Sequence, residues 1–231
     1  MRLHRFFITS NIDKGKVNTF SSLDTIHQLS RVFRLRDGDK VIFFDGSGVD
    51  HESEIVSLGK TECTFRVVDS KPVESMTDRN LALAFSLIKK DNVEWIIQKG
   101  TELGVSEFIP LVSERSEKKG FNMERAQKIM IEAVEQSGRG MLAIINEPNT
   151  FEHFLKNEKR KVIAFHTEGE SFKKEGFAGE HNLVACVGPE GGWTEREIKM
   201  FKEKGASICR LSAPILRAET AAIAVSTLLL L

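Results

Sequence analysis

The sequence predicts an α/β protein in which a small, mostly β N-terminal unit precedes a larger unit built on a mainly parallel sheet. The chain has 231 residues, which is enough for a small domain beside a medium one. Before residue 70, short apolar runs are separated by turn residues, and after residue 79 strand-length apolar runs alternate with helical patterns. A polar segment with a proline at 71–78 is typical of a linker, and we place the domains at 1–72 and 73–231.

The N-terminal unit carries four apolar runs of strand length and one helical pattern. Gly46 and Gly48 close the second run, and Gly59 and Lys60 form a turn signal before the last one. We therefore expect a small β domain with a helix at 23–33 and strands at 5–8, 40–45, 52–56 and 61–68.

The C-terminal unit alternates between strands and helices. Asp91 with Glu94, and Thr194 with Glu197, have the spacing of capping boxes at helix starts. Strands are predicted at 80–86, 107–112, 142–145, 161–166, 182–187 and 207–211, and helices at 91–104, 122–137, 151–155, 194–205 and the C-terminal run. This alternation favours a mainly parallel sheet that is covered on both faces.

Composition excludes several classes of protein. The 33 basic residues balance the 33 acidic ones, which argues against indiscriminate binding of polyanions, although residues 1–40 carry a local surplus of basic side chains. The 3 cysteines are far apart and have no closely spaced histidines, so we expect no metal site and no disulfide. The N-terminus lacks a secretory signal and the apolar run at 221–231 is too short to cross a bilayer, so we expect a cytoplasmic protein without a membrane partner.

Ligands of such sheets lie beyond the carboxyl ends of the strands, which here directs attention to 166–169, 188–192 and 212–219. The second of these loops reads Gly-Pro-Glu-Gly-Gly, and its missing side chains let a ligand approach the backbone closely. It matches neither the Walker A pattern nor the dinucleotide pattern, so by itself it is equally well explained as a crowded turn.

Charged residues stand out near these strand ends. Arg217 lies between apolar neighbours, which indicates a role in binding a carboxylate or a phosphate, while Glu219 is also explained as a first-turn carboxylate favoured by the helix dipole. Arg115 follows a strand in a polar loop, which favours a functional role. Arg139 follows a helix, where a cation is also explained by the dipole.

In combination, these motifs resemble one known family. The strings GPEGG, ILRAETA, KGTELGV, ERS and EQSGR, together with the N-terminal HRFF, HQLSRVFRLRDGD and FFDGSG, are similar to those of the ribosomal small-subunit RNA methyltransferase E family. The resemblance covers nearly the whole chain. It implies an enzyme that methylates N3 of a uridine in 16S rRNA with S-adenosylmethionine as cofactor.

The resemblance also implies a fold and an assembly. It implies a PUA-like β-barrel domain for RNA binding, then a SPOUT-type methyltransferase domain with a deep trefoil knot, in a homodimer that acts on 16S rRNA or the small ribosomal subunit. Periodicity could not have predicted a knot. The cofactor-binding residues it implies are His166, Thr167, Glu168, Val187, Gly188, Pro189, Glu190, Gly191, Gly192, Leu211, Ser212, Ala213, Ile215 and Leu216.

We hypothesise a mechanism on these residues. Arg217 and Arg115 hold phosphate or stabilise charge on the uracil carbonyls, and Glu190 or Glu219 assists loss of the N3 proton. We expect Arg217→Ala to lower turnover strongly while leaving the fold intact.

Basic and aromatic residues near the N-terminus are candidates for RNA docking. Phe6 and Phe7 are candidate stacking surfaces, but they are better explained as core. The candidate RNA contacts are Arg2, Arg5, Arg31, Arg34 and Arg139.

Three alternatives stay open. The chain could be a non-catalytic RNA-binding protein of the same fold, a methyltransferase of the same superfamily for another base, or a nucleotide-binding enzyme that uses GPEGG as a phosphate loop. The absence of a Lys-Ser/Thr pair after that loop argues against the last.

Overall fold

The computed structural model describes residues 3–74, 77–117, 120–211 and 214–231. The chain forms two compact units, one comprising Met1–Ser75 with Val134–Leu142 and the other Met76–Ala133 with Ala143–Leu231. The N-terminal unit therefore takes in a second segment, which begins inside helix α3 (Met123–Ser137). The α/β class, with a small β unit before a parallel sheet, is confirmed.

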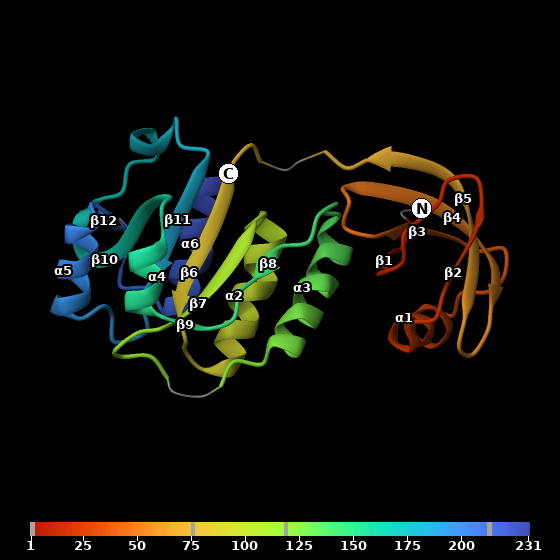
Figure 1. Ribbon diagram of the computed structural model, residues 1–231, viewed down its shortest axis with the longest axis horizontal. Coiled ribbons are helices and arrows are strands. Elements are labelled where there is room, and N and C mark those ends of the chain that lie inside the picture. The colour runs from red at the N-terminus through yellow and green to blue at the C-terminus, as the bar shows by residue number, and fades with distance from the viewer. Residues whose placement is uncertain (1–2, 75–76, 118–119, 212–213) are drawn as a thin grey trace. The chain divides into compact units, whose positions relative to one another are not determined.

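The N-terminal unit is built on a five-stranded sheet in the order β1-β3-β4-β5-β2 (Figure 1). Strands β1 and β3 pair in parallel, and the other pairs are antiparallel. Strand β2 was not predicted, and the predicted helix at 23–33 is an α-helix that continues into a π-helical turn. The elements are β1 (Arg5–Phe7), β2 (Val17–Phe20), α1 (Leu23–His27), η1 (Gln28–Val32), β3 (Lys40–Phe44), β4 (Val49–Leu58) and β5 (Cys63–Pro72).

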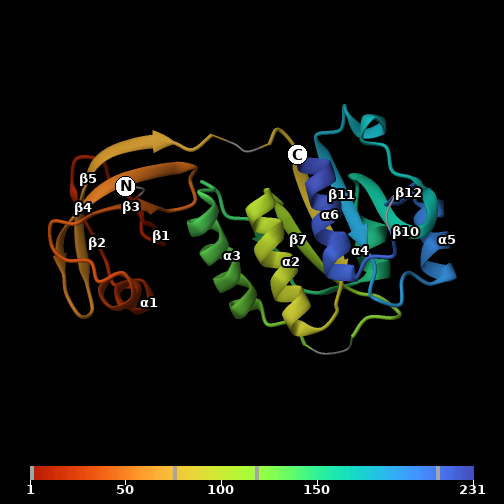
Figure 2. The ribbon, with the colours of Figure 1, turned by 180° about the vertical axis from the view of Figure 1, so that it is seen from behind.

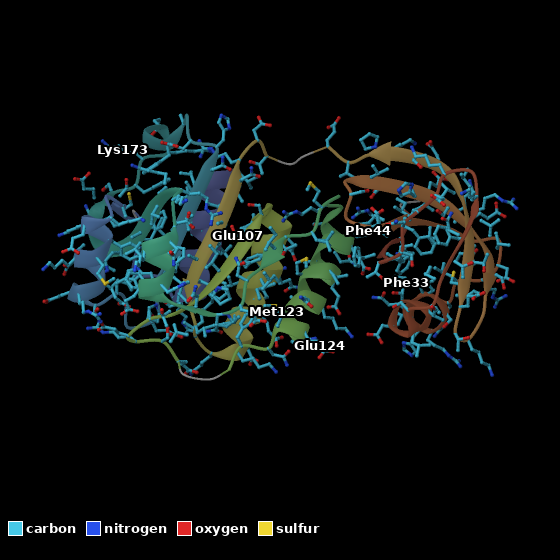
Figure 3. All side chains as sticks on the ribbon, in the orientation of Figure 1. Phe33, Phe44, Glu107, Met123, Glu124 and Lys173 are labelled. Carbon is cyan, nitrogen blue, oxygen red and sulfur yellow. The ribbon has the colours of Figure 1, made fainter. Side chains whose placement is uncertain are left out.

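Aromatic side chains fill the core of this unit because alternate strand positions point to the same face. Phe43 contacts Phe65 with ring centroids 4.4 Å apart, and Phe6 packs edge-on against Phe33, labelled in Figure 3, at 5.2 Å. Phe6 is 1% exposed, so the core explanation of this residue is correct and stacking on RNA is not.

Arg5 is also buried in this unit, which corrects its prediction as an RNA contact. Its guanidinium donates to both carboxylate oxygens of Asp50, at 2.7 and 3.0 Å, and to the carbonyls of Val134 and Arg139 at 2.9 and 3.0 Å. It also stacks over the ring of Phe44, which Figure 3 labels, at 4.4 Å. A guanidinium engaged in this way is unavailable to a phosphate.

The C-terminal unit contains a seven-stranded sheet whose pairs are all parallel. The path runs β12-β10-β11-β6-β7-β8, and β9 also pairs with β7. The strands are β6 (Asn80–Ser86), β7 (Glu107–Val112), β8 (Ile144–Ile145), β9 (Asn149–Thr150), β10 (Lys161–Ser171), β11 (Asn182–Val187) and β12 (Ser207–Arg210). Because β12 pairs with β10 on the side away from β11, the chain must cross β10 after leaving β11.

Helices cover both faces of this sheet, as the alternating pattern predicts. Helices α2 (Lys90–Leu103) and α6 (Ala218–Leu230) lie side by side on one face, and α4 (Phe151–Asn157) lies on the other (Figures 1 and 2). On the α4 face, Phe151 and Trp193 pack with Phe201 of α5 (Glu195–Glu203). Across the described ranges, no helix is long and apolar enough to span a membrane.

Two predicted caps have different outcomes. Thr194 and Glu197 form the predicted capping box, with each side chain accepting from the other's backbone N–H. The prediction of Asp91 as a cap is wrong, because α2 begins one residue earlier and has Lys89 at its N-cap position without a side-chain hydrogen bond. Glu94 instead pairs with Arg125.

Candidate active site

A cavity of about 510 Å³ lies at the carboxyl ends of β11 and β12 and beside residues 165–167 in the middle of β10. The loop at 188–192 follows β11 and the described part of the loop at 212–219 follows β12, and parallel pairing brings these two loops to one edge. The predicted loop at 166–169 is instead part of β10, at the place where the register against β12 shifts between Phe165 and Glu170. The predicted cofactor-binding residues on the wall of the cavity are His166, Thr167, Val187, Gly188, Pro189, Glu190, Gly191, Gly192, Leu211, Ile215 and Leu216.

The remaining predicted residues are placed differently. Glu168 is exposed and does not line the cavity, and Ser212 and Ala213 lie outside the described residues. Arg217 and Glu219 are also absent from the wall. Arg217 is exposed at the N-cap of α6, next in sequence to the wall residues Leu216 and Ala218.

The Gly-Pro-Glu-Gly-Gly loop is a tight turn that a larger side chain would obstruct. The N–H of Gly192 donates to the carbonyl of Pro189 at 2.8 Å, and Gly192 adopts a φ of +67°, which favours glycine. A Cβ on Gly188 would lie 3.2 Å from the indole of Trp193. This indole is 3% exposed and donates to the carbonyl of Phe165 at 3.2 Å, so it has little room to move.

Arg115 lies in the segment after β7, and its side chain reaches the Gly-Pro-Glu-Gly-Gly loop. Its Nη1 donates to the carbonyl of Gly191 at 2.6 Å, and its side chain lines the cavity. A Cβ on Gly191 would come within 3.2 Å of the Cδ of Arg115. Glycine at this position therefore lets a guanidinium lie against the loop backbone, which the sequence alone did not indicate.

Several wall residues escaped the sequence reasoning. Phe165 immediately precedes a predicted residue and Arg210 ends β12, so extending each motif by one position would have found both. The same extension finds Trp193, and the others, Pro214, Ala218 and Ala221, lie within the candidate loop at 212–219 or the ILRAETA string without having been singled out. Arg210 is notable because it adds a second guanidinium to the same cavity as Arg115.

The two carboxylates predicted to assist proton loss occupy different environments. Glu190 is exposed on the cavity wall. Glu219 lies in the first turn of α6, and its Oε2 is buried without a hydrogen-bond partner among the described residues. The geometry therefore favours Glu190 over Glu219 for contact with a ligand in the cavity.

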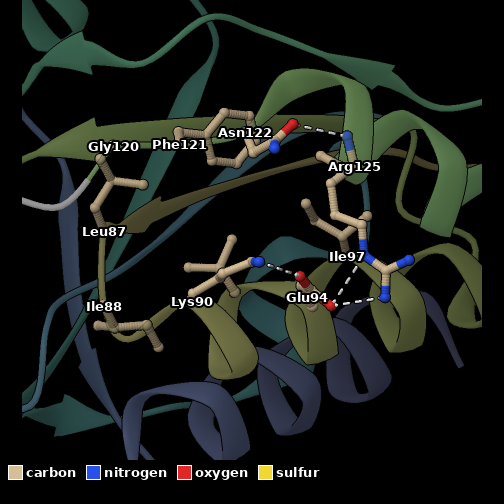
Figure 4. Close-up of a pocket in the computed structure, with 11 residues that line it drawn as sticks. Leu87, Ile88, Lys90, Glu94, Ile97, Gly120, Phe121, Asn122 and Arg125 are labelled. Atoms are coloured by element: carbon tan, nitrogen blue, oxygen red, sulfur yellow. Dashed lines mark hydrogen bonds and ion pairs between the residues drawn. The ribbon is translucent and has the colours of Figure 1, made fainter.

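A second, smaller cavity of about 30 Å³ lies between the end of β6 and the start of α3 (Figure 4). Its walls include Leu87, Ile97 and Phe121, and the Glu94 carboxylate at its rim pairs with Lys90 and Arg125 at 3.8 and 3.0 Å. This volume is large enough for a water molecule but too small for a cofactor.

The N-terminal unit has a separate open groove of about 710 Å³ between α1, η1 and the β4–β5 turn. Arg31 lines it together with Lys60 and His27. Arg34 is exposed three residues after Arg31 and has a φ of +55°. Arg2 lies outside the described residues. Arg139 is partly removed from solvent, and this burial lowers the pKa of its guanidinium. Among the predicted RNA contacts that the structure describes, Arg31 and Arg34 are exposed, Arg139 is half-buried and Arg5 is buried.

Comparisons with known proteins agree with this arrangement. An RNA methyltransferase domain family matches residues 75–230, and an RNA methyltransferase PUA domain family matches residues 25–68. Proteins named ribosomal RNA small subunit methyltransferase E from Rickettsia conorii and Bacillus subtilis are each 30% identical, covering 96% and 95% of this chain and 93% of each relative.

A solved structure extends the likeness to the fold. The ribosomal RNA small subunit methyltransferase E of Neisseria gonorrhoeae, bound to S-adenosyl methionine, is 27% identical and superposes with a TM-score of 0.88. The match covers 97% of this chain and 95% of that one.

Proposed function

This chain belongs to the ribosomal RNA small subunit methyltransferase E family, and we propose that it transfers the methyl group of S-adenosylmethionine to N3 of a uridine in 16S rRNA. The observation that carries the proposal is the cavity at 165–167, 187–193, 210–211 and 214–216, in a chain that resembles a solved structure bound to this cofactor. We assign methyl transfer to residues 73–231 and RNA docking to residues 1–72. Partner and location follow the family: a homodimer that acts on the small ribosomal subunit in the cytoplasm.

The cavity fits the cofactor by size and by chemistry. Its volume of about 510 Å³ lies within the range of ligand pockets, about 300–1,000 Å³. Phe165 and Leu216 supply apolar wall, while the glycines of the 188–192 loop carry no side chains that would keep an adenosine and an amino acid away from the backbone. When bound, the cofactor supplies an electrophilic methyl group on a sulfonium.

The residues around the cavity position the base and manage charge. In-line attack by N3 makes positioning a large part of the rate. Arg115 can stabilise negative charge on the uracil carbonyls, and Glu190 can accept the N3 proton from the exposed side of the wall. Arg217, at the N-cap of α6, is suited to an RNA phosphate because it is exposed beside the wall. The target base must be unpaired, since N3 lies inside a Watson–Crick pair.

The direct test is transfer of labelled methyl groups to small subunits from cells that lack this protein, followed by mass spectrometry of the nucleosides. We expect 3-methyluridine, with turnover strongly reduced in Arg217→Ala and Arg115→Ala but a preserved thermal unfolding temperature. Label in another nucleoside would contradict the uridine assignment. If calorimetry detects no binding of S-adenosylmethionine, the non-catalytic alternative is correct.

The predicted trefoil knot concerns the segment that leaves β11, crosses β10 and ends in α6. We propose that this segment is threaded through a loop of the chain, in agreement with the position of β12 beside β10. An experimental structure of the cofactor complex in which the segment passes outside that loop would contradict the knot.

A further inference from the structure

Glu197 carries a buried carboxylate that joins two separate loops. Glu197 lies in the first turn of α5 and is 1% exposed. Oε2 accepts from the backbone N–H of Thr194 at 2.8 Å, which is the ordinary capping-box bond. Oε1 accepts from the backbone N–H of Glu114 at 3.0 Å, and this donor is 83 residues away in sequence.

The two loops that Glu197 joins both form walls of the candidate active site. Thr194 is separated from the Gly-Pro-Glu-Gly-Gly turn by Trp193 alone, and Glu114 directly precedes Arg115. The guanidinium of Arg115 then donates to the carbonyl of Gly191 at 2.6 Å. Fixing the backbone at Glu114 therefore fixes the point from which the Arg115 side chain enters the cavity.

Other contacts between the loops are too exposed to hold this geometry. Arg196 pairs with the Glu114 carboxylate at 2.8 Å, but the two side chains are 62% and 35% exposed, and exposed ion pairs contribute little. Glu197 differs because both its oxygens bind backbone donors out of water, where hydrogen bonds to a charge are strong.

We infer that Glu197 is a positioning residue, which sets the place of Arg115 in the cavity without touching cofactor or RNA itself. The inference rests on the proposed methyltransferase function for its kinetic consequence. Its structural part, the link to the loop at Glu114, is independent of that function.

The test uses Glu197→Gln, which keeps the shape of the side chain but replaces one acceptor by an amide NH₂ that cannot accept from a backbone N–H. Glu195→Gln is the matched control, because it removes an exposed carboxylate from the same turn of α5. By hydrogen exchange, protection of the Glu114 amide should fall about tenfold or more in Glu197→Gln, as expected for losing a bond to a charged group. Protection should be unchanged in Glu195→Gln.

The kinetic arm is a double-mutant cycle with Arg115→Ala. We expect Glu197→Gln to lower kcat about tenfold while the KM for S-adenosylmethionine stays within about threefold, and to add nothing once Arg115 is alanine. If Glu197→Gln does not fold, Glu197→Asp replaces it, because its carboxylate is one methylene too short to reach both donors.

Two outcomes overturn the inference: unchanged protection of the Glu114 amide, or effects on kcat of Glu197→Gln and Arg115→Ala that multiply independently. Failure of the proposed function looks different, because then the wild-type protein transfers no methyl group. The amide protection is measured without any substrate and still tests the link in that case.

Discussion

Gly169→Ala should strongly destabilise the C-terminal unit, because a side chain at this position has no space. Gly169 lies in β10, just after the cavity residues His166 and Thr167, where the register against β12 shifts. A Cβ there would lie 2.6 Å from the carbonyl carbon and 2.9 Å from the Cα of Cys209, and 2.8 Å from the carbonyl oxygen of Ile208. All three atoms belong to the backbone of the paired strand.

The expected magnitude follows from these distances. Non-bonded carbon atoms in contact lie about 3.5–4.0 Å apart, so the two strands would have to separate by roughly 1 Å. Overpacking of this kind costs about 1–3 kcal/mol, and we expect about 3 kcal/mol of lost unfolding free energy, since no flexible side chain can turn aside. Gly179→Ala is the matched control, because a Cβ there meets nothing within 4 Å and its φ is not left-handed.

Urea unfolding followed by tryptophan fluorescence measures this difference. The chain has 2 tryptophans, Trp95 and Trp193, both in the C-terminal unit, so the signal reports on that unit. If Gly169→Ala unfolds within about 0.5 kcal/mol of Gly179→Ala, the usual range for neutral surface changes, the steric reasoning is refuted.

Three further predictions concern a buried thiol and two partly buried ion pairs. Burial raises the pKa of the Cys63 thiol to about 12, so an aromatic disulfide reagent at pH 8 should label it only after unfolding; rapid labelling of the native protein would contradict this. Burial raises the pKa of Glu158, but hydrogen bonds from Arg160 outweigh it and leave the pKa below the usual 4.5. The ion pair of Glu158 with Arg160 therefore stabilises the folded state above pH 4.5, and this contribution is lost as the pH falls below that value. The difference in unfolding free energy between wild type and Arg160→Ala should narrow in acid, and a difference that stays constant with pH would refute the coupling. Arg5→Ala removes the ion-pair partner of Asp50 and should lower the unfolding free energy of the N-terminal unit by about 3 kcal/mol. Hydrogen exchange of the sheet amides measures this loss, and exchange rates equal to those of the wild type would contradict it.

Arg31, in the groove of the N-terminal unit, is exposed where Arg5 is buried. Arg31→Ala, at an exposed position in that groove, should leave stability unchanged but reduce the salt dependence of RNA binding. This outcome would separate a phosphate contact from a structural arginine within one domain.

The sequence by itself determined the local elements, since periodicity and capping depend on residues a few positions apart. The strand at 182–187 was predicted with its observed bounds, and so was the box of Thr194 and Glu197. The loops after β11 and β12 were also predictable, because parallel strands present their carboxyl ends at one edge. The sequence did not show that β10 continues past 166, because its irregular pairing with β12 depends on a distant partner strand. Motif resemblance then supplied the cofactor and the reaction.

Only the tertiary structure decided which distant residues meet. It buried Arg5 against Asp50, paired β12 with β10, and brought the second oxygen of Glu197 to the N–H of Glu114. No local pattern encodes these contacts, because the partners lie 45 or more residues apart in the hydrogen-bonded pairs concerned. Their position depends on how whole strands and helices pack, and that packing also settles which arginines can reach a ligand.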